Sequence, residues 1–212
     1  MTDPDYRHYL LITDRSGSMA AIQPEAQAGI RLFIQEQAAL PGRATMTLCQ
    51  FDSVPETVHD FAPLEAALSY ELVPRAMTAL LDACGQAITR TGEQLAALPE
   101  GDRPGKVIML ITTDGQENAS QEYTRSQVRD LITRQQQEYG WQVAYVGANV
   151  DAFAEAASLG IPGERSLHYT ATPRATHDSY RAASAASARY ARGQSAGISY
   201  TDDERSRSGS GD

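Results

Sequence analysis

The sequence predicts an α/β protein with an open, mostly parallel central sheet, one antiparallel edge strand and helices on both faces. Short β-branched runs alternate along the chain with longer segments whose apolar residues recur every three to four positions. The run over residues 106–113 is apolar and β-branched, as expected for a central strand covered on both faces. One link, Ser53-Val54-Pro55, is too short for a parallel crossover, so the strands that flank it should be antiparallel.

Each expected element has a local signal. A helix begins near Pro24, a favoured first-turn residue, and Pro41-Gly42 ends it. Residues 57–61 follow the short link and should form a hairpin with residues 44–52, at the sheet edge. Residues 62–77 should have little regular structure. The other expected strands cover residues 8–13, 106–113, 141–147 and 166–170, and the other helices cover 79–98, 124–139, 151–159 and 176–192.

The chain divides into a domain over residues 1–172, a helix within residues 173–192 and a tail over residues 193–212. The tail is rich in Ser, Gly, Arg and Asp and poor in apolar residues, which predicts disorder. The last helix has a thin face of small residues and tyrosines, including Tyr180 and Tyr190. We expect it to pack weakly on the flank of the sheet; an interaction arm formed with the tail is the second interpretation.

Composition excludes several classes of protein. The 212 residues suffice for one domain with a substantial core, and 42% hydrophobic and 21% charged residues are typical of a globular protein. A net charge of −9 argues against nucleic-acid binding, and no apolar stretch is long enough to cross a bilayer.

Cys49 and Cys84 lie in apolar, periodic segments, which favours buried free thiols over a disulfide. A cleaved signal peptide would remove the first functional motif, so we expect a cytoplasmic protein.

Oxygen-bearing side chains follow or precede three of the expected elements. Asp14-Arg15-Ser16-Gly17-Ser18 follows the first strand, Asp114-Gly115 follows the central strand, and Thr78 precedes a long helix. Ligands of open α/β sheets bind beyond the carboxyl ends of the strands, so these segments should converge. Two carboxylates and three hydroxyls, without His or Cys, favour Mg²⁺ or Mn²⁺ over zinc or copper. The predicted metal ligands are Asp14, Ser16, Ser18, Thr78 and Asp114.

The charges of this set suit a divalent cation. The two Asp charges balance the +2 of the ion, while the hydroxyls are neutral. The ion should therefore keep an open position that attracts a further carboxylate. Gly17 supplies the flexible backbone that the tight Asp-x-Ser-x-Ser turn needs.

Three stretches of the chain carry a family resemblance. LLITDRSGSM, MTALLDA and VIMLITTDGQEN resemble the three parts of the metal-ion-dependent adhesion site of von Willebrand factor A domains, and the resemblance covers about residues 8–172. It implies a Rossmann-like sheet, the five ligands named above and a protein partner whose Asp or Glu completes the coordination. In some members the last helix shifts between tight and loose binding. The expected function is a cation-dependent adaptor or scaffold, not an enzyme, in a bacterial or phage system.

Two other functions stay open at this point. A Mg²⁺-dependent phosphoester hydrolase would also place an acid after the first strand, but such enzymes need a lysine near the phosphate. Lys106, the only lysine, begins the strand that ends at Asp114 and should lie about 25 Å away. A structural domain with an inactive site is the other alternative, since Ser and Asp commonly cap loops and helices. Nothing in the sequence specifies the oligomeric state.

Two neighbours of the predicted ligands have more than one interpretation. Arg15 could pair with a partner's acid, but a solvated loop arginine is favoured. Asp82 could orient Thr78 or a metal-bound water, or it could act as a charge at the helix N-terminus. The Gly193–Gly197 segment matches G-x-S-x-G, but it follows a helix instead of a strand, so we discount it as a nucleophile motif.

Overall fold

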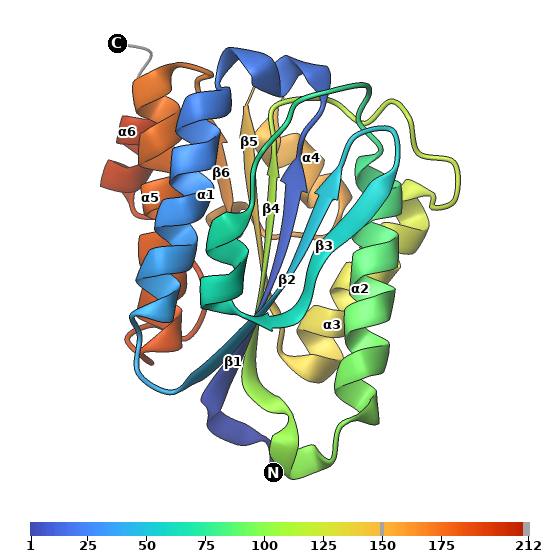
Figure 1. The fold of residues 1–212 in the computed structure, drawn as a ribbon, viewed down its shortest axis with the longest axis vertical. Coiled ribbons are helices and arrows are strands. Elements are labelled where there is room, and N and C mark those ends of the chain that lie inside the picture. Colours follow the sequence, from blue (N-terminus) through green and yellow to red (C-terminus); the bar gives the residue numbers. More distant parts are fainter. Residues whose placement is uncertain (149–150, 210–212) are drawn as a thin grey trace.

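A computed structural model describes residues 1–148 and 151–209 of the chain. A six-stranded sheet in the order β3-β2-β1-β4-β5-β6 forms its centre (Figure 1). Neighbouring strands are parallel except for β2 and β3, which form the predicted antiparallel hairpin at one edge. The predicted fold class is therefore confirmed. The strands are β1 (Asp3–Asp14), β2 (Arg43–Phe51), β3 (Pro55–Pro63), β4 (Pro104–Thr113), β5 (Gln142–Ala148) and β6 (Ser166–Tyr169).

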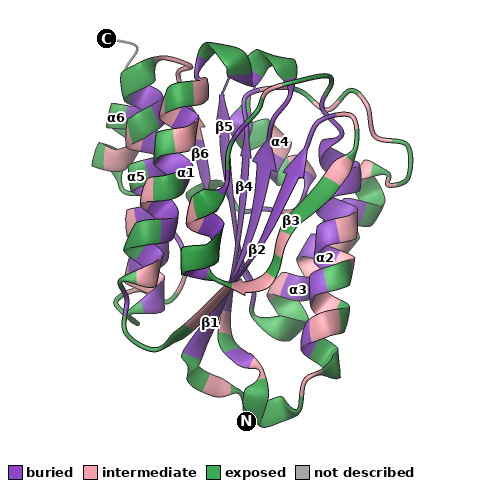
Figure 2. Ribbon diagram, viewed as in Figure 1, coloured by how far each residue is buried: buried purple, intermediate pink, exposed green. Residues whose placement is uncertain are grey.

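Helices cover both faces of the sheet (Figure 1). One face carries α1 (Gln23–Ala38) and α5 (Pro173–Ala191), and the other carries α2 (Leu80–Ala97), α3 (Arg125–Tyr139) and α4 (Ala152–Ser158). Side chains of a strand alternate between faces, so β1 sends Tyr9 and Leu11 into one apolar core and Leu10 and Ile12 into the other. Figure 2 shows the inner strands buried between helices whose outer surfaces are exposed, whereas the edge strand β3 is partly exposed.

Cys49 and Cys84 are both buried and free, as predicted. The connection over residues 62–77, for which little regular structure was expected, contains a short 3-10 helix at Leu64–Ser69. Another 3-10 helix covers Gly17–Ala21, directly after the first motif. In the described part of the chain, no helix is long and apolar enough to cross a membrane.

The last long helix, α5, packs more closely than predicted. Tyr180 is 1% exposed and its ring lies directly against Gly29 of α1. The Gln37 amide of α1 donates to the carbonyl oxygen of Ser184 at 3.1 Å and to its hydroxyl at 2.8 Å. The prediction of weak packing was wrong because small residues let the two helix backbones approach, which a count of large apolar side chains does not reveal.

Replacing Gly29 by Ala should destabilise the protein. An ideal Cβ at Gly29 would lie 2.4 Å from two ring atoms of Tyr180, so α1 and α5 would have to separate. We expect the free energy of unfolding in urea to fall by about 1–3 kcal/mol. Gly92→Ala in α2 is the matched control, because its Cβ would meet only the flexible end of Gln135 at 3.3 Å. That change should stabilise the helix by up to about 1 kcal/mol, and equal effects of the two substitutions would contradict the packing argument.

The predicted disorder of residues 193–212 is contradicted over the part that the structure describes. A further helix, α6 (Asp202–Gly209), packs beside α5 and β6. The segment before it inserts Ile198 and Tyr200, which are 1% and 7% exposed, into the core on the α1 side. The backbone N–H of Ile198 donates to the Gln142 side chain. Residues 210–212, the end of the predicted tail, lie outside the described residues.

Polar contacts explain why so few apolar residues suffice to order this segment. Arg205 donates to the backbone carbonyl oxygens of Ser166 and Gly163, at 2.7 and 3.0 Å. Thr201 and Glu204 form a capping box: the Thr201 N–H donates to the Glu204 carboxylate, and the Glu204 N–H donates to the Thr201 hydroxyl. The T-x-x-E spacing was a helix-start signal that the compositional argument overlooked.

Candidate metal centre

The sheet topology brings the three predicted loops to one edge. Asp14 is the last residue of β1 and Thr113 the last of β4, and these parallel strands are hydrogen-bonded neighbours. The carboxyl ends of both strands therefore meet at the upper end of the sheet in Figure 1. Thr78 reaches the same edge because its neighbour Ala79 donates its N–H to the carbonyl oxygen of Asp52, directly after β2.

The first loop folds tightly around the Asp14 carboxylate. Asp14 is 0% exposed, and one of its oxygens accepts the Ser16 N–H at 2.6 Å. The hydroxyl of Thr113 donates to the other oxygen. Ser16 is buried, Ser18 is exposed, and their hydroxyl oxygens lie 3.0 Å apart. The loop thus places one buried carboxylate, one buried hydroxyl and one exposed hydroxyl in a row from the interior to the surface.

Oxygen atoms from all three loops surround a small space beside Gly115. The Ser18 hydroxyl donates to the Asp114 carboxylate at 2.6 Å, which joins the first loop to the third. A Cβ at Gly115 would lie 3.3 Å from Oγ1 of Thr78, 3.6 Å from Oγ of Ser18 and 4.0 Å from Oδ2 of Asp14. The structure therefore brings all five predicted side chains into one cluster, and the absence of a side chain at Gly115 leaves room between them.

The two carboxylates of the cluster have little compensating charge. Burial raises the pKa of Asp14 to about 6, against hydrogen bonds from Thr113 and Ser16 that lower it, and the nearby charge of Asp114 raises it further. Burial also raises the pKa of Asp114. Neither acid forms an ion pair within the described residues. Two buried acids without a cation are an unfavourable arrangement that a bound cation would relieve.

The donor set fits a hard divalent cation. Within residues 1–148 and 151–209, no three His, Cys, Asp or Glu side chains gather in a group that could hold a metal ion. The candidate cluster has only two acids, and its other members are hydroxyls. Mg²⁺ accepts such a set because it prefers oxygen ligands and usually retains several waters beside one or two carboxylates.

The loop that follows Asp114 holds Thr78 in place, which sequence reasoning missed. The Thr78 N–H donates to the side-chain oxygen of Asn118 at 2.9 Å, and the Asn118 N–H donates back to the Thr78 carbonyl at 3.0 Å. The Glu117 carboxylate accepts the Leu81 N–H at 2.9 Å and so caps the start of α2. An acid and an amide in the Asp-Gly-Gln-Glu-Asn stretch were the available signal, since both residue types commonly cap helices.

Asp82 has a role that neither sequence interpretation named. It lies in the first turn of α2 and is 5% exposed. Its carboxylate accepts the backbone N–H groups of Gln121, Glu122 and Tyr123 at 2.7, 2.9 and 2.8 Å. The residue therefore anchors the loop between β4 and α3 to the beginning of α2.

Arg15 is not a solvated loop arginine, contrary to the favoured interpretation. It is 7% exposed and forms ion pairs with Asp52 at 2.9 Å and Glu56 at 3.0 Å. Burial would raise the pKa of Asp52, but the hydrogen bond from Arg75 and the charge of Arg15 outweigh it and lower the pKa. The prediction was wrong because the β2–β3 hairpin, distant in sequence, places two acids beside the first loop.

No protein-family model and no curated relative matches the chain by sequence. Solved structures do match it. The von Willebrand factor domain of the pilus tip protein Mfa5 from Porphyromonas gingivalis has a TM-score of 0.59 at 13% identity, covering 92% of this chain and 97% of that one. Proximal thread matrix protein 1 of the mussel byssus, with a zinc-occupied metal-ion-dependent adhesion site, has a TM-score of 0.56 at 14% identity over 81% of this chain. Manganese-loaded TRAP protein of Plasmodium vivax has a TM-score of 0.54 at 12% identity, covering 79% of this chain and 70% of that one.

These matches define the class of protein by its fold. The chain is an α/β domain whose strand ends gather hydroxyls and carboxylates at one edge. Its fold is that of a von Willebrand factor A domain, as the resemblance in the sequence implied. At 12–14% identity the matches show the fold alone. The chain spans 43% of the mussel protein's length.

Proposed function

We propose that the chain is a divalent-cation-dependent protein-binding domain that serves as an adaptor or scaffold. The observation that carries the proposal is the cluster beside Gly115, where three separate loops present two unpaired buried carboxylates and three hydroxyls. In this proposal the cation, Mg²⁺ or Mn²⁺, is held by Asp14, Ser16, Ser18, Thr78 and Asp114. The zinc-occupied site of the mussel protein and the manganese-loaded state of the Plasmodium vivax protein support a cation at such a site.

Each side chain has a definite part in this proposal. Asp14 and Asp114 supply the negative charge, and the hydroxyls complete an oxygen-only set without adding charge. The bound ion supplies an open coordination position that a carboxylate can occupy. Ser18 and Gly17 are exposed, so an Asp or Glu on the surface of a partner protein can reach this edge. The pilus-tip and byssus-matrix neighbours support a protein ligand over a small substrate.

The position of Lys106 supports binding over phosphoryl transfer. It lies near the amino end of β4, opposite the edge that carries the cluster. Its ammonium group donates to the carbonyl oxygens of Tyr190 and Ala191 at 3.2 and 2.7 Å. The chain's only lysine is thus bound to the end of α5, away from where a phosphate would need it.

Affinity capture from the native host tests the proposal. We expect wild-type protein to retain a partner with Mg²⁺ and to release it in EDTA, and Ser16→Ala to lose most of the partner because one ligand is missing. Ser126→Ala is the matched control, because Ser126 is an exposed helical serine on α3. The same proteins captured in EDTA would refute cation dependence. Turnover of a generic phosphoester that Asp14→Ala abolishes would favour the hydrolase instead.

Cation binding should weaken as the pH falls. The pKa of Asp14 is raised to about 6, so its carboxylate is mostly protonated near pH 5 and mostly ionised above pH 7. A proton and a cation compete for the same oxygens. We expect the Mg²⁺ dissociation constant from calorimetry to rise about tenfold between pH 7.5 and pH 5. A constant affinity across this range would contradict a metal ligand at Asp14 whose pKa is raised.

A further inference from the structure

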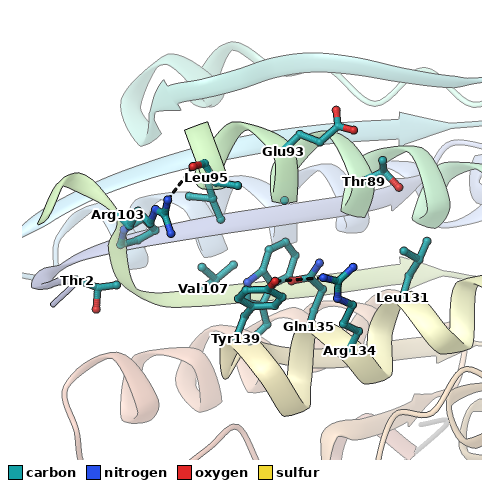
Figure 3. Close-up of a pocket in the computed structure, with 14 residues that line it drawn as sticks. Thr2, Thr89, Glu93, Leu95, Arg103, Val107, Leu131, Arg134, Gln135 and Tyr139 are labelled. Atoms are coloured by element: carbon teal, nitrogen blue, oxygen red, sulfur yellow. Dashed lines mark hydrogen bonds between the residues drawn. The ribbon is translucent and has the colours of Figure 1, made fainter. Parts of the chain in front are cut away.

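A largely apolar pocket lies at the opposite end of the sheet from the metal cluster. The pocket, of about 400 Å³, opens between the C-terminal halves of α2 and α3, above the amino ends of β4 and β5 (Figure 3). This volume is within the range of small-ligand sites, roughly 300–1,000 Å³. Its apolar lining includes Leu95, Val107, Leu131 and Trp141. The site proposed above makes no use of any of these residues.

One amide in the pocket lining has no hydrogen-bond partner in the described part of the protein. Gln135 of α3 is 9% exposed, and within the described residues its side chain forms no hydrogen bond. Gly92 on α2 faces it: a Cβ there would lie 3.3 Å from Nε2 of Gln135. The amide is reached by solvent in the pocket, so its N–H can donate to a ligand that enters there.

Two guanidinium groups line the same pocket. Arg103 donates from Nε and Nη2 to the carbonyl oxygens of Leu98 and Ala96, at 2.9 and 2.7 Å. Arg134 donates to Glu138 and to the Tyr139 hydroxyl. These bonds hold both groups at the pocket and leave Nη1 of each available. Figure 3 shows Arg134 and Gln135 on α3, with Arg103 across the pocket.

We propose that this pocket binds a small aromatic acid, a carboxylate or sulfonate on an apolar ring system. The ring system would pack against Trp141 and Leu131. The acidic group would accept the Gln135 N–H and a hydrogen bond from Arg134 or Arg103, which supplies charge complementarity. Glu93, the acid among the lining residues, disfavours multiply charged anions, so the ligand carries a single charge.

The single tryptophan of the chain provides a direct test. The probe is anilinonaphthalene sulfonate, whose fluorescence is excited by energy transfer from Trp141. We expect saturable transfer in wild-type protein, measured in EDTA so that the outcome is independent of the metal site. Phenylnaphthylamine, which has similar rings but no charge, should bind about tenfold more weakly because it cannot accept from Arg134 or Gln135.

Two variants locate the binding. Gly92→Leu fills the pocket from α2 and favours the helix, and Gln135→Leu keeps the volume but removes the donor. Each should raise the dissociation constant of the probe about tenfold, with near-ultraviolet circular dichroism confirming the fold. Gln35→Leu, an exposed position on α1, should leave it unchanged. No saturable transfer, or transfer that neither Gly92→Leu nor Gln135→Leu weakens, would overturn the proposal, because the probe would then sit on another surface.

Discussion

Asp14→Asn is expected to abolish Mg²⁺ binding and, at the same time, to make the metal-free protein more stable. Asn keeps the shape of Asp14 and an oxygen for the Ser16 N–H, but it removes the charge that a cation needs. The Asp14 pKa is raised from 3.8 to about 6 in the folded protein, so its ionised form costs stability. At pH 7.5 the shift corresponds to about 2–3 kcal/mol, an upper bound on the gain in unfolding free energy in EDTA.

The pH dependence of that gain follows from the sign of the shift. An acid whose pKa is raised on folding costs nothing below its unfolded pKa, costs progressively more up to its folded pKa and costs a constant amount above it. The difference in stability between Asp14→Asn and wild type should therefore grow between about pH 4 and pH 6 and then level off. Urea unfolding in EDTA measures the difference, and calorimetry with Mg²⁺ measures binding.

Asp60→Asn is a matched control for which the change in the free energy of unfolding should have the opposite sign. The pKa of Asp60 is lowered: burial would raise it, but hydrogen bonds from Arg90 and Gln94 outweigh the burial. Asp60→Asn should therefore lower the free energy of unfolding, by at most about 1 kcal/mol at this partly exposed ion pair, and leave Mg²⁺ binding unchanged. If Asp14→Asn still bound Mg²⁺ with wild-type affinity, the proposed ligand set would be wrong.

Asp82→Ala should cause a large loss of stability, although Asp82 is not one of the proposed metal ligands. The buried carboxylate accepts three backbone N–H groups of the loop over residues 121–123. Leaving these donors without an acceptor should lower the free energy of unfolding by about 3 kcal/mol. The freed loop begins at Asp114, so the Mg²⁺ affinity should also fall. Urea unfolding and calorimetry measure the two effects.

Glu25→Ala separates this effect from that of a helix dipole. Glu25 lies in the first turn of α1, as Asp82 does in α2, and makes no side-chain hydrogen bond in the described part of the chain. Removing the Glu25 carboxylate should lower the free energy of unfolding by at most about 1 kcal/mol. If Asp82→Ala costs no more than Glu25→Ala, then Asp82 acts only as a helix charge and the loop does not depend on it.

Much of the fold follows from local patterns. The β4 segment alternates between two apolar cores, with Ile108 and Leu110 on one face and Met109 and Ile111 on the other, so an apolar run was a sound signal for a central strand. The three-residue link after Asp52 could only join antiparallel strands. Helix-start residues are less reliable signals of a helix. Pro24 predicts the start of α1, whereas the Thr201–Glu204 capping box lies in a segment whose composition predicts disorder.

The side chains of the candidate site could also be predicted from short stretches of the sequence. The Asp-x-Ser-x-Ser spacing and the Asp-Gly that follows β4 are each contained in a single stretch of sequence, and the convergence of parallel strand ends predicts that they lie together. The residues that position the loops of the site could not be predicted from such short stretches. Asn118 binds Thr78, Asp82 binds the loop over residues 121–123, and Asp52 pairs with Arg15, so each contact joins segments that are distant in the sequence.

The sequence by itself determined the type and order of the elements, the sheet class and the five oxygen-bearing side chains of the candidate centre. Only the tertiary structure decided which acids are paired and which are left without a cation, how closely α5 approaches α1, and that residues 193–209 are ordered. The physical reason is the distance along the chain over which each kind of interaction acts. Periodicity and turn residues act within a few positions, whereas ion pairs, loop anchors and burial depend on which distant segments the folded sheet brings into contact.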